Sequence, residues 1–111
     1  MKILETKQGA VAVVKPTGPL TQAEATEFKQ VAMRTLESNL GRMLVDMSAI
    51  PFVDSLGLEA LVELTEEMTK SGQMLKLCAA NKTLREVLTL TGLGPMFEHF
   101  DDVNTAVRSF L

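Results

Sequence analysis

The sequence predicts a single α/β domain in which helices alternate with the strands of a mixed sheet. Short apolar runs bounded by glycine or proline are typical of buried strands, and between them apolar residues recur at helical spacing. Strands joined by helices require right-handed crossovers and hence a largely parallel sheet. With 111 residues, 46% of them hydrophobic, the chain has the length and composition of one globular domain, residues 1–111. We expect a sheet of four to five strands, with a β-hairpin at the N-terminal edge, and about four helices.

The chain begins with two short strand candidates, Ile3–Thr6 and Ala10–Lys15. Between them, Lys7–Gly9 has the composition of a hairpin turn, because Gly9 supplies a permissive backbone. Two prolines and a glycine predict a loop over Pro16–Pro19. These features predict the antiparallel hairpin at the edge of the sheet.

A helix is expected from Thr21 to about Asn39, because Thr21-x-x-Glu24 has the spacing of a capping box and Gly41 follows as a helix-ending glycine. Its buried face is predicted to carry Ala25, Phe28, Val31, Ala32 and Leu36. The apolar run Met43–Met47 that follows is typical of a buried strand. This part of the chain is therefore expected to form a helix and then a central strand.

A second helix is expected from about Ser55 to Lys70, after a loop over Ser48–Asp54. Its buried stripe is predicted to hold Leu58, Leu61, Val62, Thr65 and Met68. Gly72 ends this helix, and the apolar run Met74–Ala79 predicts the next strand.

The last part of the chain predicts two more helices. Asn81 can cap a helix over Lys82–Thr91, buried through its apolar residues Leu84, Val87 and Leu88. A short apolar piece, Met96–Phe100, is a candidate for a final strand. Asp101 or Asp102 then starts a helix with Val103, Ala106, Val107 and Phe110 directed inward.

Composition excludes several classes of function. The net charge is −3, without a cluster of lysine and arginine, and the chain has no Trp or Tyr to stack on bases, so a nucleic-acid partner is not expected. No apolar run approaches the ~20 residues that span a bilayer, and the N-terminal residues lack the apolar core of a signal peptide. The single cysteine, Cys78, excludes an internal disulfide. We expect a cytoplasmic protein that does not insert into the membrane and is a monomer by itself.

The residues do not predict an enzyme, a metal site or a bound cofactor. A nucleophile elbow requires Gly-x-Ser-x-Gly, but Val53 stands two positions before Ser55, and His99 is the only histidine that could act as a base. His99 and Cys78 have no recognised spacing of metal ligands. Asp46 lies on a strand as in phospho-aspartate receivers, but no acidic pair follows the first strands, so it is expected to be a polar residue at a strand end.

Ser55 is the strongest candidate for a functional residue, because it lies at the junction between a buried strand and a helix. A serine there either caps the helix or accepts a phosphate near the positive end of the helix dipole. Asp54 could cap the helix and leave Ser55 free. Gly57 in the first turn lowers helix stability, which suggests close approach by another chain, and Val53 and Leu56 would add an apolar docking patch.

The segment Val45–Leu61, VDMSAIPFVDSLGLEAL, resembles the signature of STAS domains, and in particular that of free-standing bacterial anti-sigma factor antagonists. Further matches in order along the chain are Gly18–Leu20, Gly72 with Met74–Ala79, Leu90–Leu93 with Met96–Phe97, and Asp102–Val107. The resemblance covers almost the whole chain, and it implies a STAS-like fold that catalyses nothing itself.

The resemblance implies that Ser55 is phosphorylated by an anti-sigma factor of the GHKL serine-kinase type, that the unphosphorylated form binds this kinase, and that a PP2C-type phosphatase resets the switch. It places Val53, Asp54, Leu56 and Gly57 at the partner surface. Pro19 and Thr21, which stand where many members carry acidic residues, complete that surface.

Thr21 also has a purely structural interpretation as a helix cap. The alternative for the whole chain is a STAS scaffold, or a subunit of a transport complex, in which Ser55 is only a cap.

Overall fold

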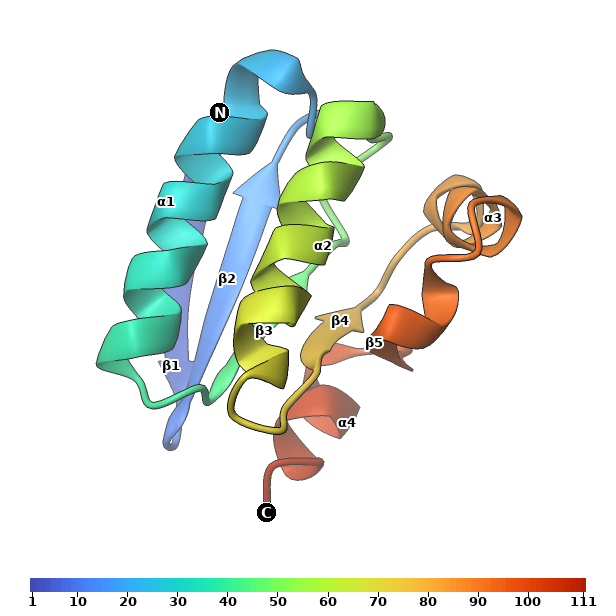
Figure 1. Cartoon of the computed structure of the whole chain (residues 1–111). Helices are drawn as coiled ribbons and strands as arrows, with labels where there is room; N and C mark the ends of the chain where they lie inside the picture. Colours follow the sequence, from blue (N-terminus) through green and yellow to red (C-terminus); the bar gives the residue numbers. More distant parts are fainter.

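The computed structural model describes residues 1–111 and contains one five-stranded sheet with four α-helices (Figure 1). The strands are β1 (Lys2–Gln8), β2 (Val11–Thr17), β3 (Met43–Asp46), β4 (Leu75–Cys78) and β5 (Phe97–Phe100). The helices are α1 (Gln22–Ser38), α2 (Ser55–Thr69), α3 (Lys82–Leu90) and α4 (Val103–Arg108), and a 3₁₀ turn over Gly94–Met96 precedes β5.

The strands lie in the sheet in the same order as in the sequence. β1 and β2 form an antiparallel hairpin, whereas β2, β3, β4 and β5 are all parallel to one another. This confirms the predicted mixed sheet with a hairpin at its N-terminal edge. Because the parallel strands point the same way, their carboxyl ends meet at one end of the sheet, and α1, α2 and α3 all begin there (Figure 1).

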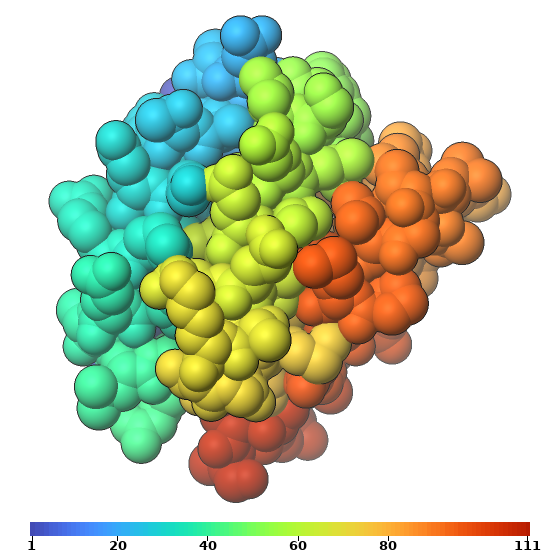
Figure 2. All heavy atoms as spheres, viewed as in Figure 1, coloured from blue at the N-terminus to red at the C-terminus, as the bar shows by residue number.

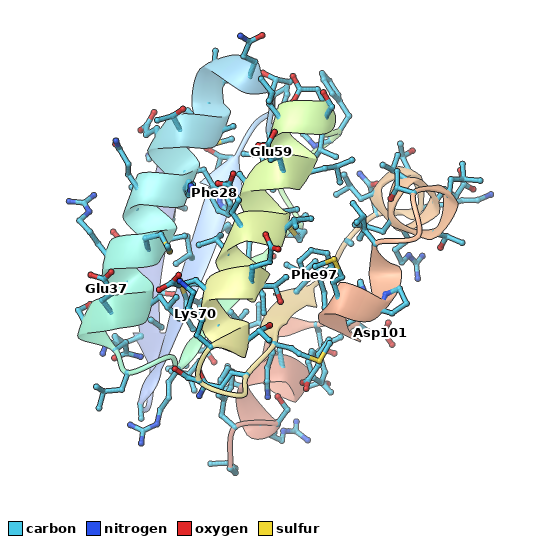
Figure 3. All side chains as sticks on the ribbon, in the orientation of Figure 1. Phe28, Glu37, Glu59, Lys70, Phe97 and Asp101 are labelled. Atoms are coloured by element: carbon cyan, nitrogen blue, oxygen red, sulfur yellow. The ribbon has the colours of Figure 1, made fainter.

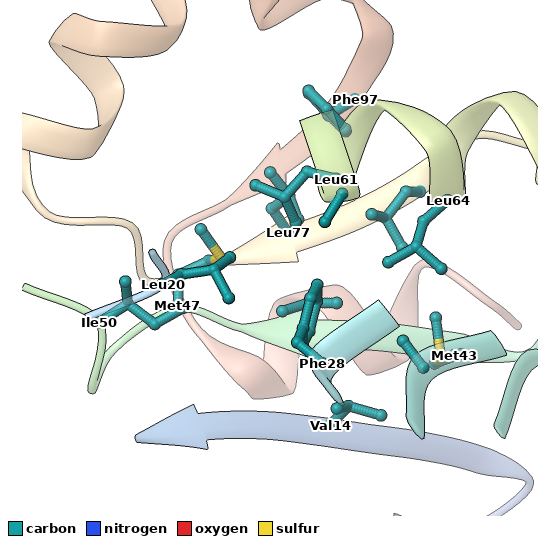
Figure 4. Close-up of a cluster of buried hydrophobic side chains, with 14 of the residues drawn as sticks. Val14, Leu20, Phe28, Met43, Met47, Ile50, Leu61, Leu64, Leu77 and Phe97 are labelled. Carbon is teal, nitrogen blue, oxygen red and sulfur yellow. The ribbon is translucent and has the colours of Figure 1, made fainter. Parts of the chain in front are cut away.

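Helices α1 and α2 cover one face of the sheet, and α4 packs on the other. The larger core lies under α1 and α2, and its fully buried members include Val14, Phe28, Leu61, Leu64 and Leu77 (Figure 4). The smaller core joins Ala106 of α4 to Val11, Val13, Leu44 and Cys78. A strand covered on both faces is mostly apolar, which explains why Met43, Leu44 and Val45 follow one another in β3 before Asp46 at its end.

Side chains on the helices follow this division between core and solvent. Phe28 of α1 and Phe97 of β5 are buried, whereas Glu59 lies on the outward side of α2 (Figure 3). An ion pair between Lys29 and Glu63 joins α1 to α2. The surfaces of these two helices lie side by side in the space-filling view of Figure 2. None of the helices combines the length and the apolar character needed to cross a bilayer.

Two local predictions for the hairpin were wrong. The turn is formed by Gly9 and Ala10 rather than by Lys7–Gly9, and Gly9 has the positive φ of 61° that was expected of it. β2 also continues through Pro16 to Thr17, where the prolines had predicted a loop. Pro16 is tolerated because the ladder between β2 and β3 ends at Val14, so its missing N–H breaks no ladder hydrogen bond.

Candidate functional site

The candidate site lies at the carboxyl ends of the parallel strands, where two loops run side by side. The segment after β2 and the segment after β3 meet in a short parallel bridge between Leu20 and Val53. Leu20 N–H donates to the carbonyl of Phe52 over 3.1 Å, and Asp54 N–H donates to the carbonyl of Leu20 over 3.2 Å. The first turn of α2 is therefore held against the chain that leads into α1.

Asp54 caps both helices with one carboxylate. Its Oδ1 accepts from the N–H of Gly57 in α2 at 2.9 Å, and its Oδ2 accepts from the N–H of Gln22 in α1 at 2.8 Å. The bond from Gly57, supported by that from Gln22, holds the pKa of the Asp54 carboxyl below its ordinary value of 3.8 against the opposing effect of desolvation. A carboxylate suits this place because it carries two acceptor oxygens and each helix N-terminus has free N–H groups.

The capping box expected at Thr21 is not formed. Thr21 occupies the N-cap position of α1, but its side chain accepts no capping hydrogen bond. Its hydroxyl donates instead to the Glu24 carboxylate. Asp54 caps this helix instead, through the N–H of Gln22, which lies 32 residues before it in the sequence.

Ser55 is the first residue of α2, and its side chain is exposed. Since Asp54 caps the helix, the interpretation of Ser55 as the cap is wrong. No hydrogen bond within the chain involves the Ser55 hydroxyl, in contrast to the Asp54 carboxylate beside it. The hydroxyl is therefore accessible at the positive end of a 15-residue helix, a position that stabilises an added negative charge.

Gly57 is buried against this chain's own backbone. A Cβ atom at Gly57 would lie 2.2 Å from the carbonyl oxygen of Leu20, closer than any real Cβ contact. The close approach that we expected from another chain is therefore made by the loop before α1. Glycine at this position allows the two loops to meet, and its contribution to a partner surface is indirect.

Exposed apolar side chains surround Ser55. Phe52 is 49% exposed and Leu56 is 38% exposed, and Pro19 and Pro51 are exposed beside them. We refer to these four residues as the apolar patch. Val53, which was expected to belong to it, is half-buried because its side chain packs against the larger core.

Phe52 was not singled out from the sequence, although it lies in the predicted loop. The available signal was an aromatic residue that directly follows a proline, Pro51, between a strand and a helix. Such a residue belongs to no periodic buried stripe of a helix or strand.

Asn81 links the loop before α2 to α3. Its Oδ1 accepts from the N–H of Leu84 at 2.8 Å, which confirms the predicted cap. Its Nδ2 also donates to the carbonyls of Ile50 and Pro51, at 3.3 and 3.2 Å. The sequence predicted the cap but not this second role, which anchors the loop that carries Phe52.

The other residues considered for chemistry have structural roles. Nε2 of His99 lies 2.8 Å from the carbonyl oxygen of Gly94, and Asp46 accepts from the N–H of Ser48 at 2.9 Å. Burial, with Asp46 as a lesser cause, raises the pKa of the Cys78 thiol to about 12. No three His, Cys, Asp or Glu side chains come together as ligands for a metal ion.

The family model of the STAS domain matches residues 2–106, and the chain belongs to this family. The protein TM1081 from Thermotoga maritima superposes with a TM-score of 0.88 at 21% identity, over 96% of this chain and 92% of that one. An anti-sigma factor antagonist from Mycobacterium paratuberculosis gives 0.84 at 23% identity, over 97% and 92%. The murine anion transporter Slc26a9 gives 0.77 at 20% identity, over 95% of this chain and 18% of the transporter. At these identities the likenesses establish a shared fold.

Proposed function

We propose that this chain is an anti-sigma factor antagonist that is switched by phosphorylation of Ser55. In the unphosphorylated state it binds an anti-sigma factor of the GHKL serine-kinase type, and phosphorylation releases that partner. One observation at the start of α2 carries the proposal. Asp54 makes the capping hydrogen bonds, so the exposed Ser55 hydroxyl makes no hydrogen bond within the chain.

The electrostatics of the site favour a switch in binding over a change of fold. A phosphate on Ser55 adds a charge of about −1.5 to −2 at pH 7. The N-terminus of α2 accommodates this charge, so the domain stays folded. A partner that covers the apolar patch would have to desolvate the phosphate next to the Asp54 carboxylate, and binding is weakened for that reason.

The partner surface extends from Ser55 over both loops. Phe52 and Leu56 supply exposed apolar area, and Pro19 and Thr21 lie on the loop that the Leu20–Val53 bridge holds alongside. The proposed partner surface is therefore centred on apolar residues. Val53 and Gly57 lie beneath this surface and help to position its residues. In this pathway a PP2C-type phosphatase resets Ser55, the domain itself is substrate and ligand, and the site of action is the cytoplasm.

The second candidate is a STAS scaffold or a subunit of a transport complex without a serine switch. The likeness to the Slc26a9 transporter favours it, because the same fold occurs there within a much longer chain. In such a protein the apolar patch is a constant docking surface, and a charge at position 55 matters only as any rim charge does.

Affinity capture from native lysate separates the two candidates. Wild type, Ser55→Ala and Ser55→Asp serve as baits, and captured proteins are quantified by mass spectrometry. Ser71→Asp is the matched control, because Ser71 is an exposed serine just beyond the other end of α2.

The proposal expects a GHKL-type kinase on wild type, Ser55→Ala and Ser71→Asp, and its loss from Ser55→Asp. Equal capture by all four baits, or capture without a kinase, would overturn the switch and favour the scaffold. Incubation of the captured kinase with ATP then provides the direct test, because wild type gains phosphate and Ser55→Ala does not.

A further inference from the structure

β1 is an edge strand whose outer side is unoccupied. It pairs with β2 along all seven of its residues, and no strand lies on its other side. Every residue of β1 except Ile3 is exposed. A long exposed edge presents free N–H and C=O groups that can pair with another strand.

The hydrogen bonding of β2 shows which residues of β1 direct their backbone groups outward. The N–H of Ala12 donates to the carbonyl of Arg42 at 2.9 Å, on the side of β3, so its neighbours Val11 and Val13 direct theirs toward β1. Gln8 and Thr6, which oppose them, point back toward β2. Ile3, Glu5 and Lys7 therefore present the free backbone groups of the edge.

Only a few antiparallel registers let these three residues form hydrogen bonds with the same edge of a second copy. The register centred on Glu5 brings two carboxylates face to face, which is unfavourable. The register centred on Leu4 places Glu5 opposite Ile3. The register centred on Thr6 places Glu5 opposite Lys7 twice, once on each side of the two-fold axis, and only here do opposite charges meet directly.

We propose that the β1 edge pairs antiparallel with the β1 edge of a second copy of this chain, centred on Thr6. The two sheets then form one continuous sheet, with two Glu5–Lys7 ion pairs across the junction. This proposal replaces the monomer expected from the sequence with a reversible dimer.

The side chains that would pair retain the capacity to do so. Glu5 accepts one hydrogen bond from the Thr35 hydroxyl through Oε1, which leaves Oε2 free. Lys7 donates one hydrogen bond to Asn39 Oδ1, and an ammonium group carries three donors. Both side chains are thereby held on the α1 side of the hairpin, where each faces the other across the axis.

The proposed junction is separate from the candidate site. It uses residues 4–8 of β1, whereas Ser55 and the apolar patch belong to the start of α2 and to the loops at the carboxyl ends of the parallel strands. Both copies in the dimer present Ser55, so the dimer and the switch can be tested independently of each other.

Cysteine cross-linking tests the register directly. In the proposed dimer Thr6 lies opposite its symmetry mate in a non-hydrogen-bonded pair, with Cα atoms about 4.5 Å apart, a distance that a disulfide spans. Mild oxidation of Thr6→Cys is expected to give a covalent dimer on a non-reducing gel. Wild type is the negative control, because its only cysteine, Cys78, is buried and should not cross-link.

Leu4→Cys and Gln8→Cys complete this test. Neither variant should cross-link alone, but a mixture of the two should, because Leu4 opposes Gln8 in this register. A disulfide dimer from Leu4→Cys alone, or none from Thr6→Cys, would overturn the proposal.

Charge variants then test whether the two Glu5–Lys7 ion pairs stabilise the dimer. Lys7→Glu is expected to raise the dimer dissociation constant about tenfold in sedimentation or light-scattering titrations, because both ion pairs become repulsive. The double change Glu5→Lys with Lys7→Glu should restore it. Lys2→Glu is the matched control, since Lys2 lies outside the paired residues. Equal effects of Lys2→Glu and Lys7→Glu would contradict the proposed pairing.

Discussion

The N-termini of α2 and α3 are capped in the same way, yet they connect to the rest of the molecule differently. In both, an Asx side chain accepts from the N–H three residues later: Asp54 from Gly57, and Asn81 from Leu84. The second oxygen of Asp54 caps another helix through Gln22, whereas the amide nitrogen of Asn81 donates to loop carbonyls. An acceptor-only carboxylate can join two helix starts, while an amide joins a helix start to carbonyls.

The residue three after the cap differs just as much. In α3 it is Leu84, whose buried side chain packs into the main core. In α2 it is Gly57, whose missing side chain admits the Leu20 carbonyl. The start of α3 is thus held by core packing, and the start of α2 is held by backbone contact and the Asp54 carboxylate. Near this start of α2, the apolar side chains of Phe52 and Leu56 are exposed.

Among the variants that affect the start of α2, substitution of Gly57 should cause the largest loss of stability. Gly57→Ala is expected to destabilise the domain by about 3 kcal/mol, because the added Cβ collides with backbone that cannot move aside without opening the Leu20–Val53 bridge. Gly94→Ala is the control, since the added Cβ would lie 3.9 Å from the Leu88 carbonyl oxygen, an ordinary contact, and it should change stability by less than about 0.5 kcal/mol. Urea unfolding measures both, and similar losses would contradict this role of Gly57.

Removal of the two caps compares the helix starts directly. Asp54→Ala should lower the urea midpoint more than Asn81→Ala, because it leaves N–H groups of two helices without their acceptor. Asn81→Ala should cost about 1 kcal/mol, the usual effect of one lost cap. A smaller loss for Asp54→Ala would show that the Asp54–Gln22 bond adds nothing to stability.

The two caps should also differ in their response to pH. The pKa of Asp54 is lowered in the folded state, so its contribution is present above the ordinary value of 3.8 and is lost as the pH falls through the folded-state pKa. The difference in unfolding free energy between wild type and Asp54→Asn should therefore shrink between about pH 5 and about pH 2. For Asn81→Ala the difference should stay constant over this range, and a parallel decline there would assign the effect to other groups.

The smallest effect is expected from Asn81→Asp. An aspartate still accepts from the N–H of Leu84, but it cannot donate to the carbonyls of Ile50 and Pro51. Global stability should change little, while amide exchange of residues 50–54 becomes faster. Unchanged exchange in this loop would show that the Leu20–Val53 bridge alone holds it.

Sequence patterns predicted the elements well where the determining signals are local. A few neighbouring residues were enough to predict the apolar run of β3, the helical spacing in α2 and the cap at Asn81. The wrong predictions arose where a distant segment intervened. Pro16 was expected to end β2, but β2 continues through it because the β2–β3 ladder stops before Pro16. The capping box expected at Thr21 does not form, because the Asp54 carboxylate from another loop caps α1.

By itself, the sequence determined the order of strands and helices and the position of Ser55 at a junction between them. Periodicity and helix capping act over a few residues, so they can be read without a fold. Only the tertiary structure decided that Asp54 serves two helices, that Leu20 occupies the space beside Gly57, and that Phe52 stays exposed. These features depend on segments about thirty residues apart, which only the parallel sheet brings to the same end of the molecule.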